Sequence, residues 1–266
     1  MKTTLQVALY HAAKAASKLN IAIALKLLYL NVTGRSIHLR LPNSDIRLSL
    51  RGQSSDYHAF YTTFVRNDYP RIPHFSPRLI LDLGANVGYS ALNFAAQYPE
   101  STIVCIEPDT ANFEVLCRST STFARIKCIN AAVHSDAGLE GTLSGPNSLS
   151  MQLNVDRPIN PGDQTTRTVS IDQLFSEWAA PNTPILVKMD IEGSEKAIFS
   201  KNLAWLPLVN YLFIEIHAGC WPTVVRALHP FISNCDITGE NLCIELKPDA
   251  KISPPPNPPA NPLSPI

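Results

Sequence analysis

The order of apolar and polar positions predicts an α/β protein from residue 78 onwards. Short apolar runs, typical of buried strands, alternate with segments in which apolar residues recur every three or four positions, typical of helices. The strand segments are 78–83, 102–107, 126–133, 185–189 and 209–216, and the helical segments are 89–97, 111–119, 170–178, 193–201 and 222–232. This alternation favours a mostly parallel sheet with helices on its faces.

Further segments complete the predicted elements. Residues 36–50 alternate apolar and polar positions around the turn cluster 42–45, which predicts a β-hairpin, and a helix is expected over 57–65. Residues 138–156 are typical of short strands and loop inserted between two strand–helix units. A second hairpin over 236–246, with its turn at Gly239-Glu240-Asn241, ends the predicted fold.

The N-terminal segment, residues 5–30, has the periodicity of an amphipathic helix. The first 44 residues contain six Lys or Arg and no Asp or Glu. The uncharged stretch between Lys18 and Lys26 is too short to cross a bilayer. Three interpretations remain open: a helix that caps the main domain or its cleft, a basic amphipathic helix that makes weak contact with an anionic membrane surface, and an organelle transit peptide.

These patterns divide the chain into three regions. Residues 1–77 form an N-terminal helical and hairpin appendage, and residues 78–248 form the α/β domain. Residues 249–266 form a tail with seven prolines, which cannot continue a helix or pair as a strand. We expect this tail to be a solvated polyproline-II segment.

Composition excludes some classes of function. The chain has 22 Lys and Arg against 22 Asp and Glu, and this balance argues against a general nucleic-acid binder. The six cysteines form no Cys-x-x-Cys pair, which predicts reduced, structural thiols. Lys14 and Lys18 interrupt any signal-peptide pattern. We therefore expect a cytoplasmic protein.

The most informative segment is 79–88, where an apolar strand pattern ends in a turn that carries Gly84 and Gly88. A strand, a glycine turn and a helix bring backbone N–H groups up to a small ligand at the carboxyl end of the strand. The next strand pattern ends at Glu107, whose carboxylate can accept both hydroxyls of a ribose. Together these features predict a site for a cofactor that contains a nucleoside.

This turn does not fit a dinucleotide. The Gly-x-Gly-x-x-Gly template, started at Gly84, requires glycines where the chain has Asn86 and Tyr89. A pyrophosphate would lose the close backbone approach that the second glycine allows. The Walker loop is absent as well, because no Gly-Lys-Ser/Thr follows. An NAD-dependent oxidoreductase is therefore the weaker alternative.

An ordered set of motifs follows the Asp-x-Gly-x-Asn-x-Gly turn at 82–88. The motifs are Glu107-Pro108-Asp109, Asn130-Ala131-Ala132-Val133, Val169-Ser170-Ile171-Asp172, Lys188-Met189-Asp190-Ile191-Glu192-Gly193-Ser194-Glu195 and Phe213-Ile214-Glu215-Ile216-His217. Their order and spacing resemble the FkbM-type family of S-adenosylmethionine-dependent methyltransferases, over roughly residues 36–246. The resemblance implies a Rossmann-like class I fold, whose seven-stranded, mostly parallel sheet has an antiparallel last strand. It also implies S-adenosyl-L-methionine as the cofactor.

The resemblance assigns the glycine turn to the methionyl part of the cofactor. Gly84 and Gly88 would give the backbone room beside it. Asp82 would either accept a hydrogen bond from the cofactor's ammonium group or hold the turn. Asn86 replaces a glycine seen in many methyltransferases, and it either contacts the cofactor or bonds the turn's own backbone.

The ends of the next two strands are assigned to the nucleoside. Glu107 is expected to accept the ribose hydroxyls, the alternative being a cap for the helix that begins near Asp109. Ala131 and Ala132 would border the adenine. These residues and the glycine turn make up the predicted cofactor site.

The candidate catalytic residues are Asp190, Glu215 and His217. Asp190 ends one strand, and Glu215 and His217 lie together at the end of another; the carboxyl ends of strands converge on one crevice in an open α/β sheet. We expect O-methylation of a hydroxyl on a small metabolite or a sugar-containing compound, with Asp190 or His217 taking the proton. Glu192 and Glu195 are expected to offset a helix dipole, and His217 has the alternative of a satisfied core imidazole.

Two further expectations complete the functional prediction. Asp190, Glu192 and Glu215 offer oxygen ligands suited to Mg²⁺, but the Asp-Asp-Asn set of metal-dependent O-methyltransferases is absent, so no required metal is expected. A protein that binds S-adenosylmethionine without catalysis is the other alternative. The polar residues retained after residue 185 argue against it.

Overall fold

The computed structural model describes residues 5–145 and 151–247. The predicted proline-rich tail, 249–266, lies outside the described residues. The chain divides into two compact units, Met1–Pro70 and Arg71–Ile266. The division falls close to the boundary predicted between residues 77 and 78.

The first unit begins with two helices where the sequence predicts one. α1 (Leu5–Lys18) and α2 (Ile21–Thr33) pack against each other. Asn20 separates them, because its side-chain oxygen accepts a hydrogen bond from the backbone N–H of Ile23 and caps α2. Leu9, which a single helix would place on the apolar face, is 49% exposed. The helical periodicity is therefore confirmed, and the continuity of the helix is wrong.

The predicted hairpin and the helix after it are confirmed. β1 (Ile37–Arg40) pairs antiparallel with β2 (Arg47–Leu50), and α3 (Asp56–Phe60) continues into a π-helical segment, η1 (Tyr61–Arg66). The carboxylate of Asp56 is fully buried and accepts a hydrogen bond of 2.8 Å from the backbone N–H of Arg51. It also pairs with the Arg51 guanidinium at 2.7 Å, which fixes the start of α3 to the end of the hairpin.

The surface of α1 and α2 carries several large apolar side chains. The exposed ones are Val7, Leu9, Tyr10, Ile21, Leu25, Tyr29 and Val32. Within 5–145 and 151–247, no helix has the length and hydropathy needed to cross a bilayer. Contact of residues 5–30 with a membrane surface stays a prediction.

A seven-stranded sheet forms the centre of the second unit, in the order β12-β13-β11-β10-β3-β4-β5. The strands are β3 (Leu79–Leu83), β4 (Thr102–Ile106), β5 (Ile126–Ile129), β10 (Ile185–Met189), β11 (Tyr211–Ile214), β12 (Ile232–Thr238) and β13 (Asn241–Leu246). The pairs from β5 to β11 are parallel, and β13 is antiparallel to both of its neighbours. The predicted α/β class, with an antiparallel last strand, is confirmed.

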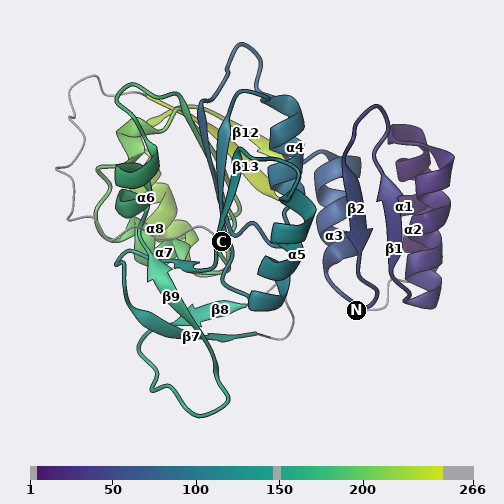
Figure 1. Cartoon of the computed structure of the whole chain (residues 1–266). Coiled ribbons are helices and arrows are strands. Elements are labelled where there is room, and N and C mark those ends of the chain that lie inside the picture. Colours follow the sequence, from purple (N-terminus) through teal and green to yellow (C-terminus); the bar gives the residue numbers. More distant parts are fainter. Residues whose placement is uncertain (1–4, 146–150, 248–266) are drawn as a thin grey trace. The chain divides into compact units, whose positions relative to one another are not determined.

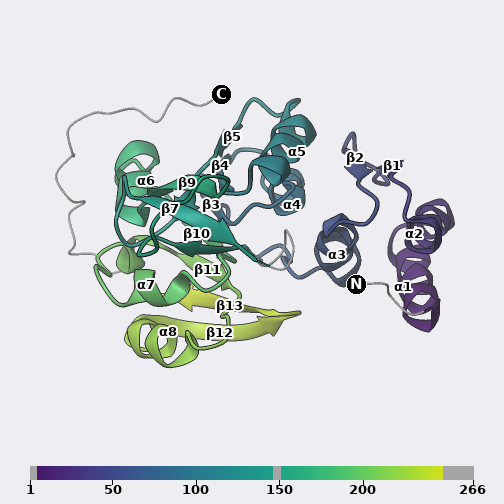
Figure 2. The ribbon, with the colours of Figure 1, turned by 90° about the horizontal axis from the view of Figure 1, so that it is seen from below.

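Helices cover both faces of this sheet (Figures 1 and 2). α4 (Tyr89–Gln97) and α5 (Thr110–Thr120) lie on one face, and α6 (Ile171–Trp178), α7 (Glu195–Phe199) and α8 (Trp221–Leu228) lie on the other. A short 3₁₀ helix, η2 (Leu206–Leu208), precedes β11. Side-chain caps fix two helix starts, since Asp109 accepts from the N–H of Asn112 and Ser170 accepts from the N–H of Gln173.

The inserted segment builds a second, four-stranded sheet in the order β6-β9-β7-β8 (Figure 1). Its strands are β6 (Ala132–Val133), β7 (Glu140–Ser144), β8 (Gln152–Asn154) and β9 (Gln164–Val169). The predicted single strand 126–133 is divided, because Ala132 and Val133 pair with Thr168 and Val169 of β9 rather than with β4. β9 was not predicted, because Gln, Thr and Arg occupy most of it.

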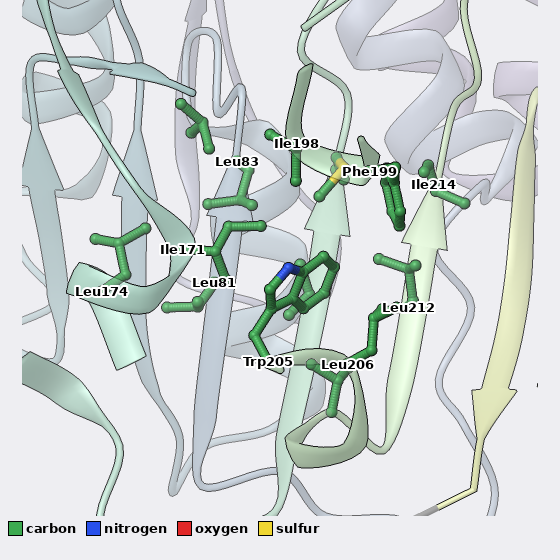
Figure 3. Packing of buried hydrophobic residues seen from close by; sticks show 14 of the residues in the cluster. Leu81, Leu83, Ile171, Leu174, Ile198, Phe199, Trp205, Leu206, Leu212 and Ile214 are labelled. Carbon is green, nitrogen blue, oxygen red and sulfur yellow. The ribbon is translucent and has the colours of Figure 1, made fainter. Parts of the chain in front are cut away.

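One face of the central sheet packs against α6, α7 and α8 in a buried apolar cluster (Figure 3). Trp205, 2% exposed, lies in the middle of this cluster, with its ring centroid 5.6 Å from that of Phe199. Leu81 and Leu83 of β3, and Leu212 and Ile214 of β11, contribute from the sheet. The cluster therefore holds the strands whose ends carry the predicted site.

All six cysteines lie within the described residues, and none forms a disulfide. Cys105, Cys128 and Cys220 are buried. The reduced state of the thiols stays a prediction.

Replacing Trp205 with Ala should lower the free energy of unfolding by roughly 3–5 kcal/mol, because the change leaves a large cavity in the cluster. Trp221→Ala is the matched control. The side chain of Trp221 is 48% exposed, so its loss should cost about 0.5 kcal/mol or less. Urea denaturation of both variants measures the difference, and equal losses would contradict the packing described here.

Candidate active site

A pocket opens at the carboxyl ends of β3, β4 and β10. It has an empty volume of about 620 Å³, part of it open to solvent, which is within the usual range of about 300–1,000 Å³ for small-molecule sites. Its lining residues are Gly84, Asn86, Ile106, Glu107, Pro108, Ala131, Ala132, Val133, Leu143, Met151, Leu153, Asp190, Ile191, Glu192 and Ser194. Six of the residues predicted for the cofactor and catalytic sites are among them: Gly84, Asn86, Glu107, Ala131, Ala132 and Asp190.

Gly84 lines the pocket because the turn after β3 passes very close to the end of β10. A Cβ atom at this position would lie 1.8 Å from the carbonyl oxygen of Asp190, and the φ angle of +77° is in the left-handed region. Only glycine fits both conditions. Asn86 also has a left-handed φ of 49°, which asparagine tolerates better than most residues. This tolerance explains how Asn fits a turn position whose backbone conformation favours glycine.

The second glycine of the turn has a different role from the one predicted. Gly88 does not line the pocket, and a Cβ atom there would lie 2.7 Å from Leu116 Cδ1. The missing side chain of Gly88 therefore allows α4 to approach α5. The expectation that Gly88 makes room for the cofactor is corrected on this ground.

Glu107 holds the turn and the strand end together from inside the pocket. Its Oε2 accepts a hydrogen bond of 2.8 Å from the N–H of Asn86, and its Oε1 accepts one of 2.9 Å from the N–H of Asp109. The residue is 6% exposed. Burial raises the pKa of Glu107 to about 7, although the two backbone hydrogen bonds act in the opposite direction.

Asp82 lies behind the pocket in a buried ion pair. Asp82 and Lys188 face each other in the register of β3 and β10, and the Nζ of Lys188 is 3.4 Å from Oδ1 of Asp82. Oδ2 of Asp82 accepts a hydrogen bond of 2.5 Å from the Ser90 hydroxyl. The side chain of Asp82 is fully buried and does not line the pocket. Of its two predicted roles, the geometry therefore favours holding the turn.

Lys188 connects this pair to the site. Its Nζ donates a hydrogen bond of 2.6 Å to the carbonyl oxygen of Gly84 and lies 3.8 Å from Oδ2 of Asp190. One ammonium group thus contacts the turn after β3 and the residue that ends β10. Because Lys188 is 3% exposed, these contacts are strengthened by the low local dielectric.

His217 lies among four carboxylates beside the pocket. Its Nε2 is 3.2 Å from Glu192, 3.8 Å from Asp190 and 3.8 Å from Glu215. Its Nδ1 is 2.7 Å from Oε1 of Glu195, which is fully buried. The prediction that Asp190, Glu215 and His217 lie close together is confirmed. Only Asp190 of the three lines the pocket.

The electrostatics of this cluster separate the three candidate catalytic residues. Burial alone would lower the pKa of His217, but its hydrogen bonds with Glu192 and Glu195 outweigh burial and raise the pKa to about 11. A raised pKa favours the protonated imidazole, so Asp190 is the better candidate of the two predicted bases, and a catalytic role for His217 stays a prediction. Burial and the charge of Asp190 raise the pKa of Glu215 to about 7.

Sequence reasoning missed part of this site. Glu192 and Glu195 were assigned to a helix dipole, but Glu192 lines the pocket and Glu195 contacts His217. Leu143, Met151 and Leu153 of the inserted segment form an apolar part of the lining. Their alternating pattern predicts strands but does not indicate which surface those strands cover.

The strand order, the antiparallel β13 and a pocket at the carboxyl ends of β3, β4 and β10 define a class I methyltransferase fold. The Methyltransferase FkbM domain model matches residues 82–236, more than half of the chain. The chain belongs to the FkbM methyltransferase family. The resemblance seen in the sequence is thus confirmed.

Individual proteins are similar to this chain over part of their length. Hexuronic acid methyltransferase AglP of Haloferax volcanii is 25% identical over 154 residues, which cover 56% of this chain and 60% of AglP. The structure of a methyltransferase FkbM from Methylobacillus flagellatus KT aligns with a TM-score of 0.45 and 13% identity, covering 89% of this chain and 58% of that one. Aeropyrum pernix fibrillarin with natively bound S-adenosyl-L-methionine aligns with a TM-score of 0.39 and 10% identity, covering 73% and 74%. The chain spans less than two thirds of the length of the first two proteins.

Replacing Lys188 with Met should lower the free energy of unfolding by roughly 3–5 kcal/mol, because the buried carboxylate of Asp82 loses its cation. The double variant Lys188→Met/Asp82→Asn should recover part of this loss. Lys201→Met, which breaks an exposed pair with Asp136, should cost about 1 kcal/mol or less. Urea denaturation of the three variants measures these values. A Lys188→Met loss no larger than that of Lys201→Met would contradict the role given to this ion pair.

Proposed function

We propose that the protein transfers a methyl group from S-adenosyl-L-methionine to a hydroxyl oxygen of a small, sugar-like acceptor. The observation that carries this proposal is that Glu107 and Asp190 line the same pocket, at the ends of β4 and β10. Glu107 has the chemistry to bind a ribose, and Asp190 has the chemistry to take a proton. Membership of the FkbM methyltransferase family supports the reaction class.

The hydrogen-bond acceptors and apolar side chains of the pocket fit this cofactor. Each carboxylate oxygen of Glu107 accepts one backbone N–H, and an ionised carboxylate has about four acceptor sites. Glu107 therefore keeps acceptor capacity for two ribose hydroxyls. The apolar side chains that line the same pocket suit the adenine ring. S-adenosyl-L-methionine has no phosphate, so the site needs no group that binds one. The apolar set is Ile106, Ala131, Ala132, Val133, Leu143 and Leu153.

The bound cofactor supplies an activated methyl group on a sulfonium sulfur. The protein's own task is then to place the acceptor oxygen in line with that methyl group, which is worth roughly 7–11 kcal/mol in well-oriented reactions. The proton of the acceptor hydroxyl passes to a carboxylate oxygen of Asp190, which faces the pocket. Lys188 and His217 hold Asp190 in place from two sides, at 3.8 Å each.

The acceptor class rests on two lines of support. The name of AglP describes a methyltransferase that acts on a hexuronic acid, and a sugar acceptor fits a site built mainly from carboxylates, which accept hydrogen bonds from hydroxyls. The alternatives are weaker. An NAD-dependent enzyme needs a turn that leaves room for a pyrophosphate, and Asn86 occupies that position. A binding protein without catalysis has no use for Asp190 and Glu215 at the strand ends.

The affinity for S-adenosylhomocysteine should increase with pH up to about 7 and level off above it. Ribose hydroxyls donate hydrogen bonds to the ionised carboxylate of Glu107, whose pKa is raised to about 7 by burial. Below that pKa, binding must first remove a proton, which costs up to a factor of about 10 in affinity per pH unit. Titration calorimetry between about pH 5.5 and 8 measures this profile.

Glu107→Gln should bind more weakly and lose the pH dependence, because its amide carries no charge. Glu114→Gln, on the exposed side of α5, is the matched control and should keep the wild-type profile. Wild-type affinity in Glu107→Gln would rule out the ribose assignment. Binding of NAD in place of S-adenosylhomocysteine would favour the oxidoreductase alternative.

Asp190→Asn should lower kcat by a factor of about 10²–10⁴, the usual contribution of a positioned base. The assay follows labelled methyl groups from the cofactor into an acceptor found by screening fractionated cell extract. The control is Asp172→Asn on α6. The side-chain oxygen of Asn can still accept the hydrogen bond that Asn202 donates to Asp172, so this variant should retain activity. Full activity in Asp190→Asn would remove this residue from the reaction.

A further inference from the structure

Asp190, Glu192 and His217 form a group of side chains whose ligand atoms lie within 4.8 Å of one another. Nε2 of His217 is 3.2 Å from Oε2 of Glu192 and 3.8 Å from Oδ1 of Asp190. Bonds of about 2.1 Å to one metal ion separate two ligand atoms by about 3 Å at a right angle and by about 4.2 Å when they are opposite. The two distances to Nε2 of His217 fall within this range, and all three ligand atoms lie within 4.8 Å of one another.

The imidazole is oriented for this role by a second, independent contact. Nδ1 of His217 is bound to Oε1 of Glu195 at 2.7 Å, and Glu195 is fully buried. A carboxylate on the other ring nitrogen is the usual partner of a metal-ligating histidine, because it fixes the ring and leaves the free nitrogen directed at the metal. Oε2 of Glu195 has no hydrogen-bond partner among the described residues.

The charge balance around the group also favours a cation. The carboxylates of Asp190, Glu192, Glu195 and Glu215 face His217. Lys188 also contacts Asp190, but its charge is shared with the buried Asp82. Carboxylates held this close together repel one another, and a bound divalent cation is a common way to offset that cost.

We propose that Asp190, Glu192 and Nε2 of His217 bind one divalent metal ion at the edge of the cofactor pocket, and that the ion takes the place of the Nε2 proton, which is released to solvent. Two carboxylate oxygens and one imidazole nitrogen are a mixed set that suits Mn²⁺, Fe²⁺ or Zn²⁺ better than Mg²⁺. The sequence predicted no required metal, because the Asp-Asp-Asn set is missing, whereas the proposed site draws on other residues. The structure uses a histidine and a glutamate from a different spacing instead.

The ion would change which acceptors the site can accommodate. Asp190 and Glu192 line the pocket, so a cation on them would attract an acceptor's hydroxyl oxygen and, for an acidic sugar, its carboxylate. Without a cation, the same carboxylates would repel an acidic sugar. The role of the ion in acceptor binding rests on the proposed methyl transfer, whereas the binding of the ion to the protein does not. The test therefore measures binding alone.

The experiment uses the untagged full chain, stripped of metal with a chelator, and titrates it with Mn²⁺ and Zn²⁺ by calorimetry. Electron paramagnetic resonance reports the fraction of Mn²⁺ that is bound. We expect one ion per chain with micromolar affinity. His217→Ala and Glu192→Gln should each weaken binding at least about 100-fold, and Glu195→Gln should weaken it by about 10- to 100-fold, because it only positions the ring. His229→Ala, an exposed histidine after α8, should bind as the wild type does.

Two results would overturn the proposal. One is the absence of binding of either ion by the wild type up to about 1 mM. The other is unchanged binding in both His217→Ala and Glu192→Gln. Circular dichroism checks that each variant is folded, and if His217→Ala unfolds, Glu192→Gln decides, because its side chain is 25% exposed. S-adenosylhomocysteine binding by the same wild-type samples separates the two ideas: a protein that binds it but no metal refutes the metal site alone.

Discussion

The buried ammonium group of Lys188 is the contact on which the site depends. It pairs with Asp82 on β3, donates to the carbonyl oxygen of Gly84 in the turn after that strand, and approaches Asp190 at the end of its own strand. One side chain thus fixes both the turn that contains Gly84 and the position of Asp190. A buried charge is costly unless it is well paired, so this arrangement leaves the turn and Asp190 little freedom to move independently. That constraint is what a site for in-line transfer requires.

The parts of the fold that were predictable are those with local signals. β3 and α4 are marked by an apolar run, a glycine turn and helical periodicity within twenty residues, and both were predicted closely. The break between α1 and α2 was missed because a single residue, Asn20, causes it while the apolar periodicity continues through it. β9 was missed because a strand made mostly of Gln, Thr and Arg has no apolar pattern; its pairing with β7 and β6 gives it its structure.

In the site, too, the residues marked by local sequence signals were predicted, and those that depend on contacts distant in the sequence were not. Gly84 and Glu107 were placed correctly, because a strand end and a turn together locate a side chain at the edge of a parallel sheet. For Asp82 two roles were left open, because only the register of β3 against β10 shows that it faces Lys188 and so favours holding the turn. The contact between Glu195 and His217 joins the start of α7 to the segment after β11. No spacing in the sequence indicates such a contact, which fixes the imidazole ring through Nδ1.

The proposed function requires that the nucleoside of the cofactor binds at Glu107 and that the transferred methyl group lies next to Asp190. A crystal structure with S-adenosylhomocysteine and Mn²⁺ tests this claim most directly. The account predicts the ribose hydroxyls within hydrogen-bonding distance of the Glu107 carboxylate, with the cofactor sulfur directed towards Asp190. A nucleoside bound elsewhere, or a sulfur directed away from the end of β10, would contradict it.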